Sequence, residues 1–278
     1  MKQGGKASGG FTIVETLIVL AVTGMLFASA VLLINGRQNK TEFLTAVNNL
    51  QQQLQQIINQ TTSGYYPNAH DFKCLHGTPP TIDGTGSNVQ GTNGDCTFLG
   101  SVIYFGPGQS PAKFSVYPLA GNRLDTASKT VTTLAAAWPV ALAQGNLTNG
   151  GAPNDDYTSY TMEGGLSYVW GPNPLPLNNP LAIGVITSVG GDASPATTGS
   201  QQFRLYGFTN SWAGIASSKD IVDKINKATT STSSTAIIPW AGPLRACIAS
   251  GTTKQSALIS ISQSLQVSLV IKNGTVCA

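Results

Sequence analysis

The feature that most constrains this chain is a long uncharged segment close to its N-terminus. Nineteen consecutive residues, Thr16 to Ile34, carry no charge, and most of them are apolar. At 1.5 Å per residue, a helix of this length matches the hydrocarbon thickness of a bilayer. The sequence therefore predicts one helix that crosses a membrane.

The helical pattern continues well beyond this apolar segment. Neither Pro nor Gly occurs between Arg37 and Thr62. Apolar residues recur there at helical spacing and form one stripe: Phe43, Leu44, Val47, Leu50, Leu54, Ile57 and Ile58. The opposite face is polar but almost uncharged, with Asn48, Gln51, Gln52, Gln55 and Gln56. A single helix over residues 11–62 is about 78 Å long, and we expect it to serve as a spine for a folded domain.

Composition limits the kinds of partner that the folded domain binds. Charged residues are 10% of the chain, against roughly 25% in typical soluble domains, so the surface is polar but largely uncharged. The net charge of +3 includes Lys2 and Lys6, and without them 13 basic residues face 12 acidic residues. This balance argues against binding to phosphate groups through bulk charge, and nucleic acid is not expected as a partner.

Residues 63–278 have the pattern of a β-rich domain. The helical pattern stops at Ser63, Gly64 and Pro67, and short apolar runs broken by Gly, Asn and Pro follow. Strands are predicted over residues 101–105, 113–117, 166–170, 181–189, 202–208, 244–250, 256–262 and 265–271, the last three as a meander. A short helix capped by Ser218 is predicted over residues 219–228. The expected fold is α+β, with the long N-terminal helix packed against a C-terminal antiparallel β-sheet.

Four cysteines indicate two disulfides. Cys74, Cys96, Cys247 and Cys277 all follow the apolar segment, as expected for a domain that reaches an oxidising compartment. Three pairings are possible. Loop-closure entropy favours the two local ones, Cys74 with Cys96 and Cys247 with Cys277.

Catalytic, cofactor and metal sites are poorly supported by the sequence. His70, Asp71, Cys74 and His76 have irregular spacing for metal ligands, and a disulfide explains the cysteine better. Both histidines of the chain lie in this cluster, and no G-x-S-x-G motif or paired-carboxylate motif is present. We expect no catalytic residue, cofactor or metal, and we predict that the chain is not an enzyme. The tryptophans are expected to pack in the core rather than to form a binding surface: Trp138, Trp170, Trp212 and Trp240.

Glu15 places a carboxylate at the start of the apolar helix. Insertion scales assign a charged side chain in the middle of a membrane helix a cost of roughly 2.5–3.5 kcal/mol. The next cation along the chain is Arg37, which is out of helical reach. Cleavage just before Phe11 would create a positive α-amino group four residues from Glu15, or supply one on a neighbouring copy. We expect this amine to be the partner of Glu15.

Gly10, Phe11, Thr12 and Glu15, followed by LIVLAV, resemble the class III signal of type IV prepilins and pseudopilins. The resemblance covers about the first 50 residues. It implies that a prepilin peptidase cuts after Gly10 and that the new amino terminus, Phe11, is methylated. It also implies that Glu15 neutralises the terminal amine of an adjacent subunit during assembly. The chain lacks the proline that kinks this helix in many major pilins.

The resemblance implies a pilin-like architecture and a structural role. Residues 1–10 would be a leader peptide, residues 11–62 a transmembrane and amphipathic spine, and residues 63–278 an extracytoplasmic head. The implied function is a subunit of a type IV pilus or related filament, held in the cell membrane before assembly and in a cell-surface or periplasmic filament afterwards. Its implied partners are other pilin subunits, the prepilin peptidase, the inner-membrane assembly platform and the lipid bilayer. The pair Cys247 and Cys277 would resemble the C-terminal disulfide loop of many pilins.

Several alternatives stay open on the sequence alone. Major and minor pilins are not distinguished. A tip adhesin or a DNA- or surface-binding minor pilin is possible, as is a pseudopilin of a type II secretion or competence system. A monomeric membrane-anchored protein is a further class, and Ala28, Ser29 and Ala30 also fit the cleavage site of an ordinary secretory signal.

Overall fold

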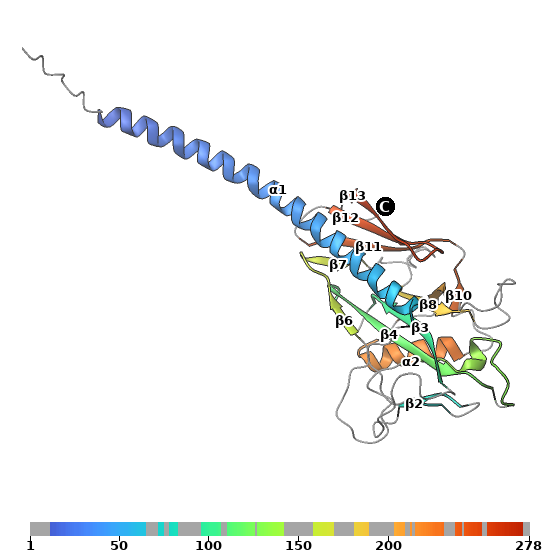
Figure 1. Ribbon diagram of the computed structural model, residues 1–278. Helices are drawn as coiled ribbons and strands as arrows, with labels where there is room; N and C mark the ends of the chain where they lie inside the picture. The colour runs from blue at the N-terminus through green and yellow to red at the C-terminus, as the bar shows by residue number, and fades with distance from the viewer. Residues whose placement is uncertain are drawn as a thin grey trace, which may run out of the picture.

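The structure of the protein is a computed structural model with an α+β fold (Figure 1). It describes residues 12–64, 72–74, 78–82, 96–106, 110–125, 127–141, 158–169, 181–188, 203–208, 212, 215–230, 237–240, 242–251 and 255–274. Its helices are α1 (Ile13–Thr62), α2 (Ser218–Thr230) and the 3-10 helix η1 (Ala135–Ala137). The strands are β1 (Phe72–Lys73), β2 (Thr81–Ile82), β3 (Cys96–Tyr104), β4 (Lys113–Asn122), β5 (Val140–Ala141), β6 (Thr158–Thr161), β7 (Leu166–Tyr168), β8 (Ala182–Thr187), β9 (Phe203–Phe208), β10 (Ile237–Pro239), β11 (Leu244–Ser250), β12 (Gln255–Ile261) and β13 (Val267–Asn273).

Helix α1 is continuous over 50 residues and therefore about 75 Å long. It begins at Ile13 because Thr12 is its N-cap: the backbone of Thr12 is extended, and its hydroxyl accepts a hydrogen bond from the Glu15 N–H at 3.3 Å. It ends at Thr62, where the Ser63 N–H donates to the Asn59 carbonyl at 3.0 Å. Phe11, the first residue of the predicted helix, lies outside the described residues.

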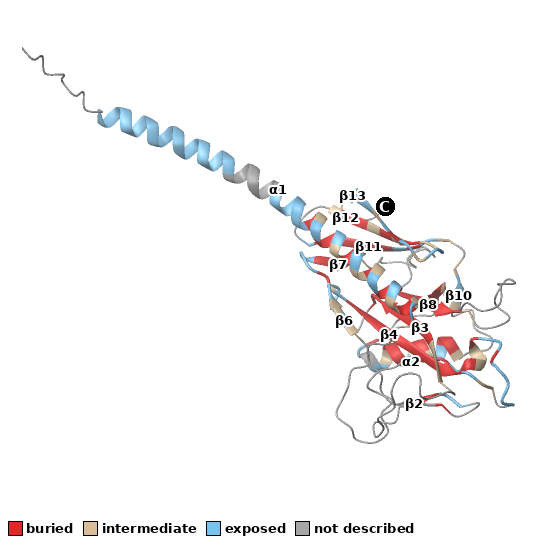
Figure 2. Cartoon of the chain, in the orientation of Figure 1, coloured by how far each residue is buried: buried red, intermediate tan, exposed pale blue. Residues whose placement is uncertain are grey.

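The two halves of α1 have different surroundings, as the burial colours in Figure 2 show. Residues 13–30 are exposed at every position, whereas the second half buries one face in the head. The buried positions follow the predicted stripe closely: Phe43, Ala46, Val47, Leu50, Leu54, Ile57, Ile58 and Thr61. Leu44 is only half-buried. The spacing of three or four residues keeps one side of the helix on the core.

The strands form two main antiparallel sheets, where the sequence led us to expect one. The larger sheet has the order β10-β9-β8-β3-β4-β5, and β6 also pairs with β4. The second sheet has the order β13-β12-β11-β7, and its β11, β12 and β13 form the predicted meander. A small third sheet pairs β1 with β2. The single-sheet expectation was wrong because strand partners depend on long-range packing that a one-dimensional pattern does not contain.

Two central strands are longer than predicted, for local reasons. Gly100 has φ of 134° and lies at a register shift in β3. The strand therefore continues through this glycine, whereas the predicted strand began one residue after it. Pro118 lies inside β4, where the prediction ended the strand at Tyr117. On the side of β4 away from β3, β6 pairs with residues 113–116 and β5 pairs with residues 119–120. Pro118 therefore lies between the segment of β4 that pairs with β6 and the segment that pairs with β5. Its missing N–H interrupts no strand pairing on that side.

Two hydrophobic cores lie on opposite faces of the larger sheet. One core packs the second half of α1 against both main sheets, with Ile103, Phe114 and Ile259 among its buried members. The other packs α2 and η1 against the far face of the larger sheet, around Tyr104 and Ile225. Because both faces are covered, β4 is buried at nine of its ten positions and shows no inside–outside alternation.

Helix α2 covers the predicted short helix and is slightly longer. The predicted cap, Ser218, is the first residue of the helix, and the capping position belongs to Ser217, whose hydroxyl accepts a hydrogen bond from the Asp220 N–H at 3.4 Å. The carboxylate of Asp220 accepts hydrogen bonds from the backbone N–H groups of Ala216 and Ser217 at 3.0 and 2.9 Å. These hydrogen bonds lower the pKa of the Asp220 carboxyl group. Exposed Lys219 and Asp223 form an i,i+4 ion pair at 2.9 Å. These contacts fix the start of α2, which packs in the second hydrophobic core.

Candidate functional site

The candidate functional site is the exposed first half of α1. Residues Ile13–Ala30 have a mean hydropathy of 2.1, and none of them is buried. By length and composition this segment is able to cross a membrane. Ten of its large apolar side chains are more than half exposed: Ile13, Val14, Leu17, Ile18, Val19, Leu20, Val22, Met25, Leu26 and Phe27. A surface of this kind needs lipid or another protein to cover it.

The hydroxyl groups within this segment are satisfied by the helix itself. Thr16 donates to the Ile13 carbonyl at 2.8 Å, Thr23 donates to Val19 at 2.7 Å, and Ser29 donates to Leu26 at 2.8 Å. A side chain that hydrogen-bonds to its own helix exposes no unsatisfied donor to an apolar environment. The polar residues of the segment are thus compatible with hydrocarbon or with a packed helix bundle.

Glu15 is the one charged residue in the described stretch 12–30. It lies in the first turn of α1, and its N–H donates to Thr12. Thr12 and Glu15 have the spacing of a capping box, and the positive end of the helix dipole favours a carboxylate there. Glu15 therefore has a local role at the helix start in addition to the predicted intermolecular one. Gly10 and Phe11, the predicted cleavage and methylation positions, lie outside the described residues.

The β6–β7 turn marks where α1 enters the head. Gly164 has φ of 63°, and a Cβ atom placed there would lie 2.6 Å from the Cβ of Ala46. Beside it, the Asn49 side chain donates to Glu163 at 3.4 Å. The turn needs glycine both for its left-handed backbone and for its close approach to the helix. The exposed half of α1 projects from this end of the head (Figure 1).

Two glutamines on α1 bind backbone groups of Leu265 and Val267, just before and at the start of β13. The Gln51 side chain donates to the Val267 carbonyl at 2.9 Å, and the Val267 N–H donates to the Gln55 side-chain oxygen at 2.8 Å. The Gln55 amide also donates to the Leu265 carbonyl at 3.2 Å. The sequence assigned these glutamines to the polar face of the helix but contained no sign that they bind a strand.

A shallow depression of about 440 Å³ lies along the same helix, open to solvent. Its lining comes from the end of α1 and its C-cap, Ser63; the helix residues are Gln52, Gln55, Gln56, Asn59 and Gln60. Amides and one hydroxyl supply neither a general base with a pKa near neutrality nor a metal ligand set. The depression therefore suggests no reaction.

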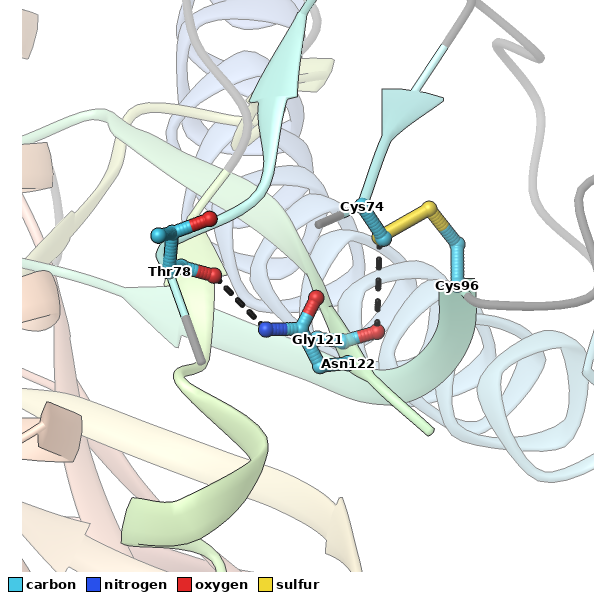
Figure 3. Close-up of a disulfide and its surroundings, with 5 residues drawn as sticks. All are labelled: Cys74, Thr78, Cys96, Gly121 and Asn122. Atoms are coloured by element: carbon cyan, nitrogen blue, oxygen red, sulfur yellow. Dashed lines mark hydrogen bonds between the residues drawn. A yellow bond between two sulfur atoms is a disulfide. The ribbon is translucent and has the colours of Figure 1, made fainter. Parts of the chain in front are cut away.

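The structure contains the predicted disulfide between Cys74 and Cys96, with Cα atoms 5.3 Å apart (Figure 3). The sulfur of Cys74 lies 3.8 Å from the Gly121 carbonyl oxygen. The next residue, Asn122, donates to the Thr78 carbonyl at 2.6 Å. The bond thus attaches the chain before β2 to the β3–β4 hairpin. Cys247 is also disulfide-bonded, and its predicted partner Cys277 lies outside the described residues.

The remaining sequence candidates have different outcomes. Cys74 is in a disulfide, and the neighbouring His70, Asp71 and His76 lie outside the described residues. In the described part of the chain no three His, Cys, Asp or Glu side chains gather as a metal site would require. Trp212 is buried as expected, whereas Trp138 is 37% exposed, which corrects the core assignment for that residue. Its position as the left-handed cap of η1 is not visible in the sequence.

Comparisons with models of known protein families, with curated proteins and with solved structures find no match to this chain.

Proposed function

We propose that this chain is a structural subunit of a type IV pilus or related filament. One observation carries the proposal: a continuous helix holds its second half in the core of the head, whereas the 18-residue, largely apolar segment Ile13–Ala30 of its first half has no buried position. If α1 only anchored the head in a membrane, lipid alone would be enough to cover its exposed half. The additional presence of the Gly10, Phe11 and Glu15 motif favours a helix that leaves the bilayer and packs against its own copies.

Before assembly, the exposed half of α1 holds the subunit in the membrane. Removing one large apolar side chain from water contributes about 1.5–3 kcal/mol, so the ten exposed side chains of this segment make the free state in water strongly unfavourable. The self-satisfied hydroxyls of Thr16, Thr23 and Ser29 add little cost to burial. The same surface is covered by neighbouring helices in the filament.

Assembly pairs Glu15 with the processed amine of Phe11 on an adjacent copy. The carboxylate lies in the first turn, so a neighbouring N-terminus reaches it only if the two helices are offset along their axes. Pairing removes the cost of an isolated charge among apolar residues and selects one axial register. The prepilin peptidase and the membrane assembly platform are the partners that this pathway requires.

Shearing tests the proposal directly. Filaments sheared from cells that express the chain should contain it, shortened by its leader of residues 1–10. A chain found only in the membrane fraction of cells that do form filaments contradicts a structural role.

A second candidate function, ligand binding by a tip subunit, is favoured by Trp138. This residue is exposed and adopts φ of 51° and ψ of 60° although a proline follows it. A bulky residue in this region is strained, and such strain is found most often at functional sites. Comparing surface adhesion of cells that carry Trp138→Ala with that of wild-type cells tests this candidate. Equal adhesion with equal filament number removes its support.

A further inference from the structure

The outer edge of strand β13 is open along most of its length. Among the described strands, β13 pairs only with β12, so no neighbouring strand lies along its other edge. At the first residue of β13, side chains of α1 take that place: the Val267 N–H donates to Gln55, and the Val267 carbonyl accepts from Gln51. Within the described residues, no contact of this kind continues along the strand.

The contacts of Val267 show which backbone groups point outward. Along an edge strand, the N–H and C=O groups of successive residues point alternately toward the paired neighbour and toward the open side. Val267 directs its groups to the open side, where α1 binds them. Leu269, Ile271 and Asn273 therefore direct theirs to the same side. In the part of the chain that the structure describes, these groups meet no partner. Such an edge is a template for one more strand.

Exposed apolar side chains flank this edge on both faces of the sheet. Val270 is 49% exposed and Ile271 is 40% exposed. Because side chains alternate, Ile271 lies on the α1 face with Val267 and Leu269, and Val270 lies on the far face. An occupant that covers both must reach two faces and supply backbone hydrogen bonds between them. An extended strand does this, whereas a helix or a lipid surface leaves the backbone groups of the edge unpaired.

We propose that the open edge of β13 pairs with the same edge of a second copy of this chain. The two β13 strands run antiparallel and join two four-stranded sheets into one continuous sheet. Such an interface has two-fold symmetry, so each copy contributes the same residues to it.

One register of this pairing fits the edge. It places Ile271 opposite Ile271 of the second copy and Leu269 opposite Asn273 of the second copy. All three outward residues then have partners, and each pair exchanges two hydrogen bonds. On one face the two Ile271 side chains contact each other. On the other face Val270 lies opposite Lys272 of the second copy, whose aliphatic stem covers it while the ammonium group stays in water.

The two neighbouring registers that keep the same hydrogen-bonding groups together are less favourable. A pairing centred on Lys272 places two like charges directly opposite each other, which destabilises a strand pair. A pairing centred on Val270 places Asn273 opposite Val267, whose backbone groups α1 already binds. The charge of Lys272 and the α1 contact thus select the register centred on Ile271.

The symmetry determines which copies meet through this edge. Helix α1 packs on one face of the sheet, and a two-fold axis perpendicular to the sheet makes the two α1 helices run in opposite directions. Subunits of one filament share a direction. If the proposed function is right, on which this step rests, the edge therefore joins subunits of two separate filaments. A contact of residues 269–273 is far below the roughly 1,000 Å² of a stable interface, so it is weak alone and gains strength by repetition along both filaments.

Disulfide trapping of the full-length chain in detergent tests the pairing without a filament. In the proposed register the two Cα atoms at position 271 lie about 5.5 Å apart, within the reach of a disulfide. Ser268 is exposed on the same strand, but its two copies lie about 20 Å apart along the strand. With a mild oxidant, Ile271→Cys should give at least about tenfold more product of twice the chain mass than Ser268→Cys. Equal yields overturn the inference. So does an Ile271→Cys chain that stays monomeric, since the edge is then left to water or to a strand of another protein.

Charge substitutions at the same position test the contact between filaments. Filaments of Ile271→Glu, or of Ile271→Lys, place like charges directly opposite each other and should form at least about tenfold fewer bundles in electron micrographs. Mixing the two kinds of filament should restore bundles, because Glu then meets Lys. Ser268→Glu filaments should bundle as the wild type does, and equal thermal unfolding of the variants shows that the head stays folded. Wild-type filaments that never bundle, or charge variants that mixing does not rescue, overturn the inference.

Failure of the pairing is distinguishable from failure of the proposed function. If the chain never enters filaments but Ile271→Cys forms the dimer in detergent, the proposed function is wrong and the pairing of β13 edges stands. If the chain enters filaments but yields neither dimer nor bundles, the proposed function stands and the pairing is refuted.

Discussion

The side-chain oxygen of Gln55 accepts a hydrogen bond from the backbone N–H of Val267 at 2.8 Å, so α1 satisfies an edge group of β13 in place of a neighbouring strand. The amide of the same side chain donates to the Leu265 carbonyl at 3.2 Å. A side chain that both accepts and donates in this way sets the position of the helix along the sheet. Apolar contacts alone tolerate more sliding, because they lack direction.

The Gln55 contact predicts a difference between two adjacent glutamines. Gln55→Ala should lower the free energy of unfolding by about 1–3 kcal/mol, because it leaves the Val267 N–H and the Leu265 carbonyl without the side chain that binds them. Gln56→Ala, at an exposed position one residue later, should change it by less than about 0.5 kcal/mol. Urea unfolding of the full chain in detergent measures both. Equal effects would show that the hydrogen bonds to β13 contribute nothing specific.

Gly164 predicts a second stability contrast. Gly164→Ala adds a methyl group 2.6 Å from Ala46 and strains a backbone with φ of 63°. We expect a loss of about 1–3 kcal/mol, from the positive φ and from overpacking against α1. Gly242→Ala is the control, since a Cβ at that position meets no atom within 4 Å. A Gly164→Ala protein as stable as the control would mean that the turn moves away from the helix at little cost.

The disulfide between Cys74 and Cys96 predicts a loss of stability on its removal. The two residues are 22 positions apart, for which the chain-entropy model gives about 3 kcal/mol. The Cys74→Ala/Cys96→Ala double variant should therefore unfold at lower urea concentration, with the exposed half of α1 unaffected. Alkylation of denatured, unreduced wild-type protein should label no thiol. Labelling of any of the four cysteines would contradict the expected pair of disulfides.

Much of this fold was predictable from local pattern. The buried stripe of α1, the α2 helix and the β11–β12–β13 meander follow from apolar spacing and capping residues, which act within a few positions of each other. Each of the eight predicted strands overlaps a strand of the structure. No strand was predicted at β1, β2, β5, β6 or β10, which have two to four residues and too few positions for a period to be seen.

The arrangement of these elements was not predictable. The division into two sheets, the passage of β4 through Pro118 and the contact of Gln55 with Val267 all depend on residues far apart in the chain. For the candidate site, the sequence was enough to identify the apolar half of α1, from the length of its uncharged segment, and Glu15, from its charge at the start of that segment. It gave no indication that Val270 and Ile271 of β13 are exposed, since exposure depends on which strands pair.

Glu15 predicts a separation between insertion and assembly. Glu15→Ala should leave membrane insertion and leader removal intact, because alanine makes the helix more apolar, while incorporation into filaments falls sharply. Thr12→Ala tests the local role, since it removes the cap at the helix start without changing charge. Immunoblots of sheared filaments and membranes measure both. A Glu15→Ala chain in filaments at wild-type level would refute the pairing with the Phe11 amine.

The most direct test of the account is the mass of the N-terminal peptide of the mature chain from its native cells. A filament subunit processed as proposed begins at Phe11 and carries one methyl group on its α-amino nitrogen. Gly10 replaced by a bulky residue should then leave only the uncleaved precursor in the membrane. A mature chain that begins at Met1, or one cut after Ala30 so that the apolar half of α1 is lost, would contradict the account.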